Sequence, residues 1–524
     1  MAENITNNTE EWQPKYGPWL GAIPTIFAAF MFVLDETVAN VALPHMAGTF
    51  SISRDESMWI LTFYLVASGV VIPMVDWFCK IMGRKAFFMF SLALFTVSSV
   101  LCGLANSFEM MIFSRILQGI GGGGLLPIAQ AILLENFKPA ERGKAMAVFG
   151  LVIIIAPIIG PVIGGWITEN WSWPWIFFMN LPIGILSLFV SNQFIEDPPY
   201  AKKQSGVKFD AIGFSFLALW MITMQIVLDK GNSNDWFSCT WILQLTIISA
   251  TSFLAFIISQ LLVKKPLVDL SIFLDKNYAI CTTIRFMVSA ILLASIAILP
   301  QFLQSLLGYD AFKSGLTLMP RGLAGIVTMA ILSRISTKVD GRILTAFGLL
   351  VIGIAGLMLG NLNLEISAMN VVIPNLVFGF GMGFAMVPLI SLSVVTLKNS
   401  QMTNASGVQS MLANVGGAIG TSVCTTIISR FSQMHQNMMV GNLSPLNPVY
   451  QTKLAAIKGA LMHYTSSGVA THMAQYSLYG TMIKQSTLWG FIEAFRYVGI
   501  ASIVLIPLIF LIKKMDQNQP HNTN

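Results

Sequence analysis

The segment Met31-Phe-Val-Leu-Asp-Glu-Thr-Val-Ala-Asn-Val-Ala-Leu-Pro44 places a carboxylate, Asp35, in the middle of an apolar stretch that covers residues 20–43. About 20 apolar residues are enough for a helix to cross the hydrocarbon core of a bilayer. A carboxylate at that depth is costly unless it is paired, protonated or facing water, so Asp35 is a candidate functional group. The alternative is a structural acid that is paired with a neighbouring helix.

The composition of the whole chain is that of a polytopic membrane protein. Of the 524 residues, 55% are hydrophobic and only 10% are charged, whereas charged residues make up about 25% of average soluble proteins. Fourteen stretches are apolar and long enough to be transmembrane helices: 20–43, 58–79, 86–105, 110–134, 145–167, 175–195, 211–228, 241–263, 278–303, 315–332, 344–362, 366–392, 407–428 and 488–512. The sequence therefore predicts an all-α integral membrane fold.

The connections between these spans carry an uneven distribution of positive charge. Lys and Arg are concentrated on alternate connections, beginning before the first span and ending with Lys513 and Lys514 after the last. Such a bias marks the cytoplasmic side of a membrane protein. Both termini are therefore predicted to be cytoplasmic.

A weak internal repeat predicts the domain organisation. Lys, Gly and Arg recur at matching offsets after the second and tenth spans: Lys80, Gly83 and Arg84, then Lys338, Gly341 and Arg342. Internal repeats are common in transporter folds. We predict a six-helix bundle in residues 1–195, two inserted helices with their flanking loops in 196–277, and a second six-helix bundle in 278–524.

The longest connection, residues 431–487, lies on the predicted outer side. Asn447 followed by Pro448 is typical of a helix N-terminus, and Leu454, Ile457 and Leu461 recur at helical spacing. This pattern favours a helical hairpin. A mobile loop is the alternative, because short isolated helices are only marginally stable.

Depth along the helices relates Asp35 to a cation. Asp35 lies roughly 12 Å from the outer end of the first span, and Arg115 lies roughly 8 Å below the outer end of the fourth, at 1.5 Å per residue. A carboxylate near a guanidinium is held ionised while desolvation acts in the opposite direction, so such a pair can be tuned to exchange a proton. Gln118 and Asn40 are candidates for the same polar network, or for ordinary contacts between helices.

The fifth span contains a strip of small residues and prolines: Ala156, Pro157, Gly160, Pro161, Gly164 and Gly165. Small residues four apart allow another helix to approach closely, and prolines bend a helix. The strip is either a bent hinge that seals one side of a cavity or an ordinary small-residue contact.

Other charged residues also lie inside the spans. Glu493 and Arg496 are three residues apart, which favours a structural ion pair, although Glu493 and Arg321 are also candidates for a polar network that lines the substrate cavity. The partners of Arg285 and Arg321 cannot be assigned from the sequence.

Signatures of enzymes and metal sites are absent from the sequence. No Walker loop, HExxH motif or convincing nucleophile elbow occurs, and the five cysteines have neither CxxC nor metal-ligand spacing. We therefore expect a non-enzyme that needs neither a cofactor nor a metal.

Several stretches together resemble the major facilitator superfamily. Residues 34–44, 115–119 and 160–165 are similar to its first-helix signature, its motif B and its antiporter motif C. The fourteen spans, residues 173–184 and the long outer loop resemble the fourteen-helix drug/proton antiporters and, among these, EmrB-like multidrug exporters.

This resemblance implies a major facilitator fold that exports hydrophobic or amphipathic toxic compounds in exchange for protons, by alternating access. It implies that Asp35 is the proton-linked acid and that Arg115 is its partner. It also implies a bacterial inner-membrane location, a periplasmic adaptor of the EmrA type and an outer-membrane channel of the TolC type.

The chain departs from the family pattern at two places. The loop after the second span has Asp76 and Lys80 where the family motif has Gly and Asp, which changes the expected cytoplasmic gate of Asp76, Lys80, Gly83 and Arg84. The first Gly of motif C is Ala156. Export of one metabolite, such as a siderophore or a fatty acid, and a non-transporting receptor or scaffold are the alternatives.

Overall fold

The computed structural model describes residues 14–198, 203, 209–263, 266–335, 339–397 and 401–512. Within these residues, fourteen helices are long and apolar enough to cross a membrane, which confirms the predicted all-α fold of fourteen spans. Several basic residues that entered the orientation argument lie outside the described residues: Lys202, Lys208, Lys264, Lys265, Lys338, Lys398, Lys513 and Lys514.

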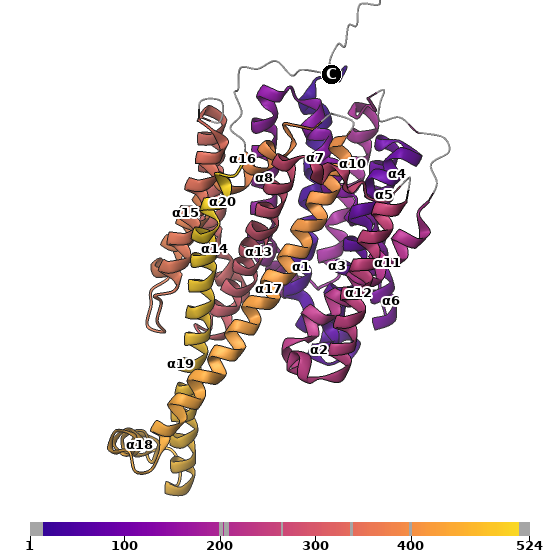
Figure 1. The fold of residues 1–524 in the computed structure, drawn as a ribbon. Helices are drawn as coiled ribbons and strands as arrows, with labels where there is room; N and C mark the ends of the chain where they lie inside the picture. The colour runs from indigo at the N-terminus through magenta and orange to yellow at the C-terminus, as the bar shows by residue number, and fades with distance from the viewer. Residues whose placement is uncertain are drawn as a thin grey trace, which may run out of the picture.

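The first ten α-helices include six spans, and α2 lies outside them (Figure 1). They are α1 (Pro18–Phe50), α2 (Arg54–Ser57), α3 (Trp59–Val71), α4 (Val75–Met82), α5 (Arg84–Gly103), α6 (Phe108–Gly123), α7 (Leu125–Asn136), α8 (Pro139–Asn170), α9 (Trp175–Phe178) and α10 (Asn180–Phe194). A short 3-10 helix, η1 (Ile72–Met74), joins α3 to α4.

The remaining helices form eight further spans. They are α11 (Ala211–Lys230), α12 (Thr240–Leu262), α13 (Lys276–Ser305), α14 (Ala311–Ile335), α15 (Gly341–Leu359), α16 (Met369–Val394), α17 (Met402–Val440), α18 (Pro448–Leu461), α19 (Ser467–Val504) and α20 (Ile506–Ile509), of which α18 lies outside the spans. Several helices begin at a polar residue that caps the first turn. Asp275, for example, accepts a hydrogen bond from the backbone N–H of Tyr278 at 2.8 Å at the start of α13.

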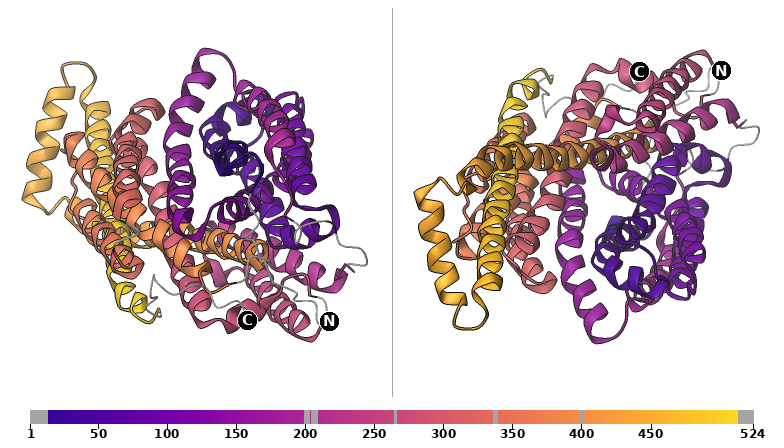
Figure 2. Two further views of the ribbon diagram at one scale, coloured as in Figure 1. Left: turned by 90° about the horizontal axis from the view of Figure 1, so that it is seen from above. Right: turned by 90° about the horizontal axis from the view of Figure 1, so that it is seen from below.

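The helices are grouped in two lobes, which Figure 2 shows from above and below. We call α1–α10 the N-lobe and α13–α20 the C-lobe. The upper face is the end at the top of Figure 1, where α1 begins, and the lower face is the end at which α18 lies. Along one side of the molecule the lobes are joined by α8 and α14, which pack against each other.

Near the upper face the two lobes share one hydrophobic core. Ala22, Ala29 and Leu133 of the N-lobe belong to the same buried cluster as Ile284 and Val387 of the C-lobe. A second cluster, around Phe32 and Phe95, consists of N-lobe residues alone. The lobes are therefore closed against each other at the upper face.

The helices α11 and α12 cover a seam between the lobes. Trp220 and Met221 of α11 belong to one buried cluster with Ile72 of η1 and Met411 of α17. Farther down, Thr62 of α3 donates a hydrogen bond to Asp229 of α11 at 2.6 Å. The inserted pair of helices therefore contacts both lobes through α11.

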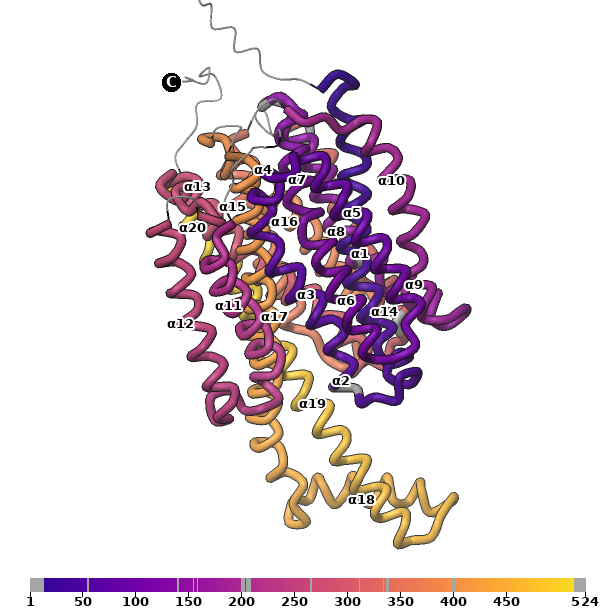
Figure 3. The backbone as a smooth tube through the Cα atoms, turned by 90° about the vertical axis from the view of Figure 1, so that its right-hand side faces the viewer, coloured from indigo at the N-terminus to yellow at the C-terminus, as the bar shows by residue number. Residues whose placement is uncertain are grey.

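The connection after the thirteenth span is helical. The helices α17 and α19 continue beyond the body of the molecule, and α18 lies at their far end (Figure 3). Asn447 accepts a hydrogen bond from the backbone N–H of Val449 at 2.9 Å, as its N-cap position predicts. The structure therefore has the helical hairpin rather than the loop. The predicted span ends at 428 and 488 lie inside α17 and α19, because both helices continue through polar residues outside the membrane segment.

Candidate functional site

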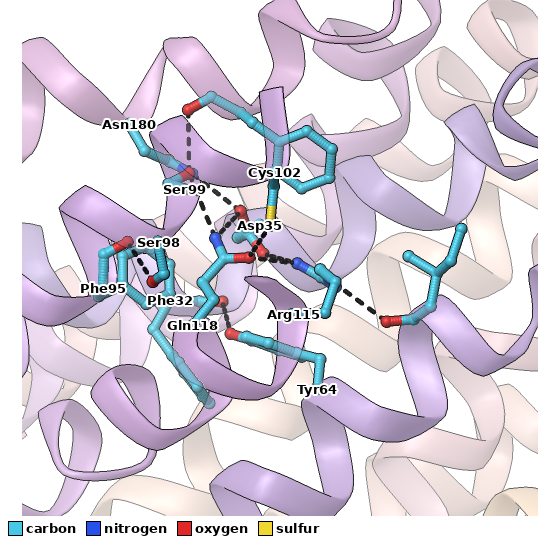
Figure 4. Close-up of polar contacts among 12 residues, drawn as sticks. Phe32, Asp35, Tyr64, Phe95, Ser98, Ser99, Cys102, Arg115, Gln118 and Asn180 are labelled. Carbon is cyan, nitrogen blue, oxygen red and sulfur yellow. Dashed lines mark hydrogen bonds and ion pairs between the residues drawn. The ribbon is translucent and has the colours of Figure 1, made fainter. Parts of the chain in front are cut away.

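Asp35 lies at the centre of a buried polar cluster in the N-lobe (Figure 4). Its side chain is 1% exposed. Arg115 Nη1 donates to Oδ2 at 2.6 Å, and Gln118 Nε2 and Asn180 Nδ2 each donate to Oδ1 at 2.8 Å. Three donors, one of them charged, stabilise the ionised carboxylate and satisfy it without water.

The guanidinium of Arg115 is held by further contacts. Its Nε donates to the carbonyl oxygen of Ile60 at 3.1 Å, and its Nη1 also donates to Gln118 Oε1 at 2.8 Å. The ring of Tyr64 lies 4.2 Å from the Arg115 Cζ, a cation–π arrangement. The Ser99 hydroxyl accepts from Gln118 and from Asn180. These contacts fix the Asp35–Arg115 pair, and Arg115 Nη2 is left without a hydrogen-bond partner among the described residues.

Glycines bring α6 close enough for these contacts. A Cβ at Gly119 would lie 2.5 Å from the carbonyl oxygen of Tyr64 on α3, and one at Gly121 would lie 2.6 Å from the backbone nitrogen of Phe95 on α5. Only glycine permits backbones to approach this closely. The sequence of α6 thus brings the helix that contains Arg115 close to α3 and α5.

The sequence predicts four members of this polar network, and the structure brings three of them together. Asp35, Arg115 and Gln118 are in contact, whereas Asn40 is exposed on α1. Sequence reasoning missed Asn180 and Ser99 as members. Asn180 follows the Trp-rich start of the sixth span, which was a usable signal, while nothing distinguished Ser99 from other serines inside the spans.

The predicted gate residues lie at the upper face. Arg84 is buried and forms an ion pair with Glu135 of α7, and its Nη2 donates to Thr403 of α17 at 2.6 Å. Lys80 pairs with Asp76 of its own helix at 2.5 Å. Gly83 adopts a φ of 85° between α4 and α5, a conformation that favours glycine. Arg84 therefore connects the two lobes through Thr403. Its acid partner within the N-lobe, Glu135, was not identified from the sequence.

A second connection between the lobes at this face involves Arg285 of α13. Its Nη1 donates to Gln409 Oε1 at 2.5 Å, and its Nη2 donates to Gln130 Oε1 of the N-lobe at 3.4 Å. Gln409 in turn donates to Ser393 at 2.5 Å. The guanidinium of Arg285 thus donates to amide oxygens rather than to a carboxylate.

Arg321 of α14 is a second buried cation of the C-lobe. It is 2% exposed, its Nη2 donates to the Ser295 hydroxyl at 2.7 Å, and its Cζ lies 3.9 Å from the centre of the Phe378 ring. Within the described part of the chain, no acid forms an ion pair with Arg321.

The small-residue strip of α8 faces α1 inside the N-lobe. A Cβ at Gly160 would overlap the side chain of Thr37, and one at Gly164 would lie 3.0 Å from Val38 Cγ1. The other predicted members, Ala156, Pro157, Pro161 and Gly165, continue the same helix, and Ala156 is fully buried. The close contact that small residues predict is therefore made with α1.

Glu493 lies in an ion pair away from the Asp35 cluster. Arg496 Nη1 donates to Glu493 Oε1 at 3.1 Å, and Arg496 Nε donates to the carbonyl oxygen of Gly360 at the end of α15. This geometry supports the structural interpretation of the pair.

Comparisons with known proteins agree with this architecture. The model of the Major Facilitator Superfamily matches residues 25–421. The chain is 31% identical to the multidrug export protein EmrB of Escherichia coli (strain K12), over 93% of each chain. It is 30% identical to the fatty acid resistance protein FarB of Neisseria gonorrhoeae, over 93% of this chain and 94% of that one.

A solved structure is similar in fold. The human organic anion transporter MFSD10 superposes with a TM-score of 0.61 at 13% identity, covering 95% of this chain and 100% of that one. The fourteen spans, the match to the family model and the similarity to EmrB show that this chain belongs to the major facilitator superfamily of transporters.

Proposed function

We propose that this chain is a proton-coupled antiporter that exports many hydrophobic or amphipathic toxic compounds. The similarity to EmrB, whose name is that of a multidrug export protein, supports export. The observation that carries proton coupling is the ion pair of Asp35 and Arg115 inside the first and fourth spans, 2.6 Å apart. An intramembrane carboxylate is a characteristic element of proton relays.

The chemistry of coupling follows from the three donors to Asp35. In the described geometry the carboxylate is stabilised as an anion, so protonation requires that Arg115, Gln118 or Asn180 withdraws. These donors come from α6 and α10, whereas Asp35 belongs to α1. A rearrangement of α1 against its neighbours separates Asp35 from these donors, and in this proposal that separation couples proton uptake to movement of the lobes.

Alternating access in this proposal is a rocking of residues 1–195 against residues 278–524. Opening at the upper face must break the contact of Arg84 with Thr403 and that of Arg285 with Gln130. The strip from Ala156 to Gly165 on α8 is the proposed hinge.

The proposed orientation has the upper face in the cytoplasm, with both termini there, and α18 in the periplasm of a bacterium. The far end of the α17–α19 extension has strongly exposed aromatic side chains, among them Tyr464 at 89% and Tyr476 at 79%. A pocket between α18 and α19 is lined by Ile457, Leu461, His472, Met473, Tyr476 and Ser477. We propose that this surface contacts a periplasmic adaptor of the EmrA type, which leads to a channel of the TolC type.

The test is cargo-driven proton movement in proteoliposomes that contain a pH-sensitive dye. We expect the wild-type protein to exchange protons for hydrophobic compounds, and the Asp35→Asn variant to insert normally but to lose the exchange. Glu109→Gln is the matched control, because Glu109 is an exposed acid on the same helix as Arg115. Unchanged export by Asp35→Asn would remove proton coupling through this residue.

A second candidate function is export of one class of fatty-acid-like metabolite. The 30% identity to the fatty acid resistance protein FarB favours it. The two functions differ in cargo range, so a panel of hydrophobic cations, neutral dyes and fatty acids in the same proteoliposomes separates them.

A further inference from the structure

Glu36, the residue after Asp35, differs from it in burial and in hydrogen bonding. Asp35 is enclosed and has three donors, whereas the next residue, Glu36, is only half-buried. Among the residues that the structure describes, none forms a hydrogen bond or an ion pair with the Glu36 carboxylate. Of these two adjacent acids of α1, Asp35 is therefore enclosed by the protein and Glu36 is partly accessible.

The face of α1 that contains Glu36 can be followed along the helix. Residues three or four apart lie on one face, and such a row runs down α1: Ala22, Ile26, Ala29, Val33, Glu36, Asn40 and Pro44. The first four are buried, Glu36 is half-buried, and Asn40 and Pro44 are exposed. Burial along this face therefore decreases from the upper to the lower end.

The identity of the buried part shows which way this face is directed. Ala22, Ile26 and Ala29 belong to the core that joins the N-lobe to the C-lobe. A different face of the same helix carries Ile23 and Phe27, which are 43% and 50% exposed, as expected of side chains that contact lipid. Val33, the next member of the row, belongs to the cluster of N-lobe residues. Glu36 and Asn40 thus lie on this face below the core that the lobes share, at the level where the face becomes accessible.

We infer that Glu36 binds the positively charged group of a cationic amphipathic cargo, in the accessible region between the lobes. This inference rests on the proposed export function and deepens it by naming a cargo class and its contact. The nearby cation, Arg115, is already paired with Asp35. The charge of Glu36 therefore has no counter-charge of its own, and a cationic cargo supplies one inside the low-dielectric membrane region.

Asn40 lies one turn below Glu36 on the same face and is exposed. An amide at this position offers a hydrogen-bond acceptor and two donors to a cargo without adding charge. In this arrangement Glu36 provides the discrimination by charge, and Asn40 provides a neutral polar contact.

The test is equilibrium binding to the purified full-length protein with two probes, the cation tetraphenylphosphonium and the uncharged dye Nile red. The variants are Glu36→Gln, which removes the charge at constant size, and Glu36→Asp, which keeps it. We expect Glu36→Gln to weaken tetraphenylphosphonium binding by at least about tenfold, since loss of a charge partner in a partly buried site exceeds the 1.4 kcal/mol of one decade.

The same experiment contains the controls. Glu36→Asp should retain most of the affinity for the cation, Nile red should bind to all variants alike, and Glu109→Gln should behave as the wild type. Equal affinity of Glu36→Gln and wild type for tetraphenylphosphonium would overturn the inference, and so would a parallel loss of both probes.

Failure of this inference is distinguishable from failure of the proposed function. Cargo-driven proton movement that is lost in Asp35→Asn but unaffected for cations in Glu36→Gln would leave the antiporter proposal intact and overturn the role of Glu36. A wild-type protein that binds tetraphenylphosphonium through Glu36 but moves no protons would support the site and overturn proton coupling.

Discussion

Each lobe contains a deeply buried guanidinium inside its spans, and the two are compensated differently. Arg115 of the N-lobe is fully buried and has a carboxylate at 2.6 Å. Arg321 of the C-lobe is 2% exposed, yet its contacts are a hydroxyl and an aromatic ring, Ser295 and Phe378. Both cations have lost their hydration, but only the N-lobe replaces it with an opposite charge.

The comparison shows that, of these two buried guanidinium groups, the one in the N-lobe is the one paired with a carboxylate. Removing one member of a buried ion pair leaves the other as an uncompensated charge, whereas replacing a buried cation that has no acid partner leaves none. The same substitution should therefore have unequal effects in the two lobes.

The largest expected effect is that of Arg115→Met. It leaves Asp35 buried without its cation, which destabilises proteins by about 3–5 kcal/mol. Arg321→Met is the matched substitution in the C-lobe and should cost clearly less. Thermal unfolding in detergent measures both, and equal losses would contradict the contrast between the lobes.

The next effect tests the pair itself with a double-mutant cycle. In Asp35→Asn/Arg115→Gln both charges are absent. The double variant should therefore lose less unfolding free energy than the two single variants together, by about 0.5–3 kcal/mol. Asp35→Asn combined with Arg321→Gln is the control and should be additive. Additivity in the first pair would show that the two residues do not interact energetically.

A smaller effect is expected where the lobes meet at the upper face. Arg84 has an acid partner, Glu135, whereas Arg285 has only the amide oxygens of Gln130 and Gln409. Glu135→Gln should therefore loosen the upper face more than Gln130→Leu does. The readout is the labelling rate, by a membrane-impermeant thiol reagent, of a cysteine introduced at Thr403 in a cysteine-free background, and equal rates in the two variants would contradict the ranking.

The smallest effect on the lobes is expected from removing α18. This helix packs on α19 and lies beyond the body of the molecule. Replacement of residues 443–466 by a short Gly-Ser linker should change the free energy of unfolding by less than about 0.5 kcal/mol, while co-purification with an adaptor should decrease. Undiminished co-purification would remove α18 from the proposed adaptor surface.

Much of the architecture could be predicted because the bilayer imposes a length and a polarity on every span. The fourteen spans follow from that rule, and the common depth of Asp35 and Arg115 follows from the rise of a helix. The direction in which a residue points around its helix axis depends on which helices are neighbours. That is why the pairing of Arg84 with Glu135 was not predicted.

Glu36 illustrates a signal that was present but not used. The spacing of Ala22, Ile26, Ala29, Val33 and Glu36 marks a single helix face in the sequence alone. Adjacent acids nevertheless look alike in a linear sequence, because only packing decides that Asp35 is enclosed and that Glu36 is not.

The position of α11 and α12 makes the two membrane-facing flanks of the molecule different. These helices roof the junction of η1 and α4 with α17, so on that flank a molecule leaving the bilayer first encounters a protein layer. On the opposite flank, α8 and α14 lie directly side by side. The two flanks are therefore closed in different ways, one by an added pair of helices and the other by direct contact between the lobes, which makes the fourteen-helix body asymmetric within the membrane plane.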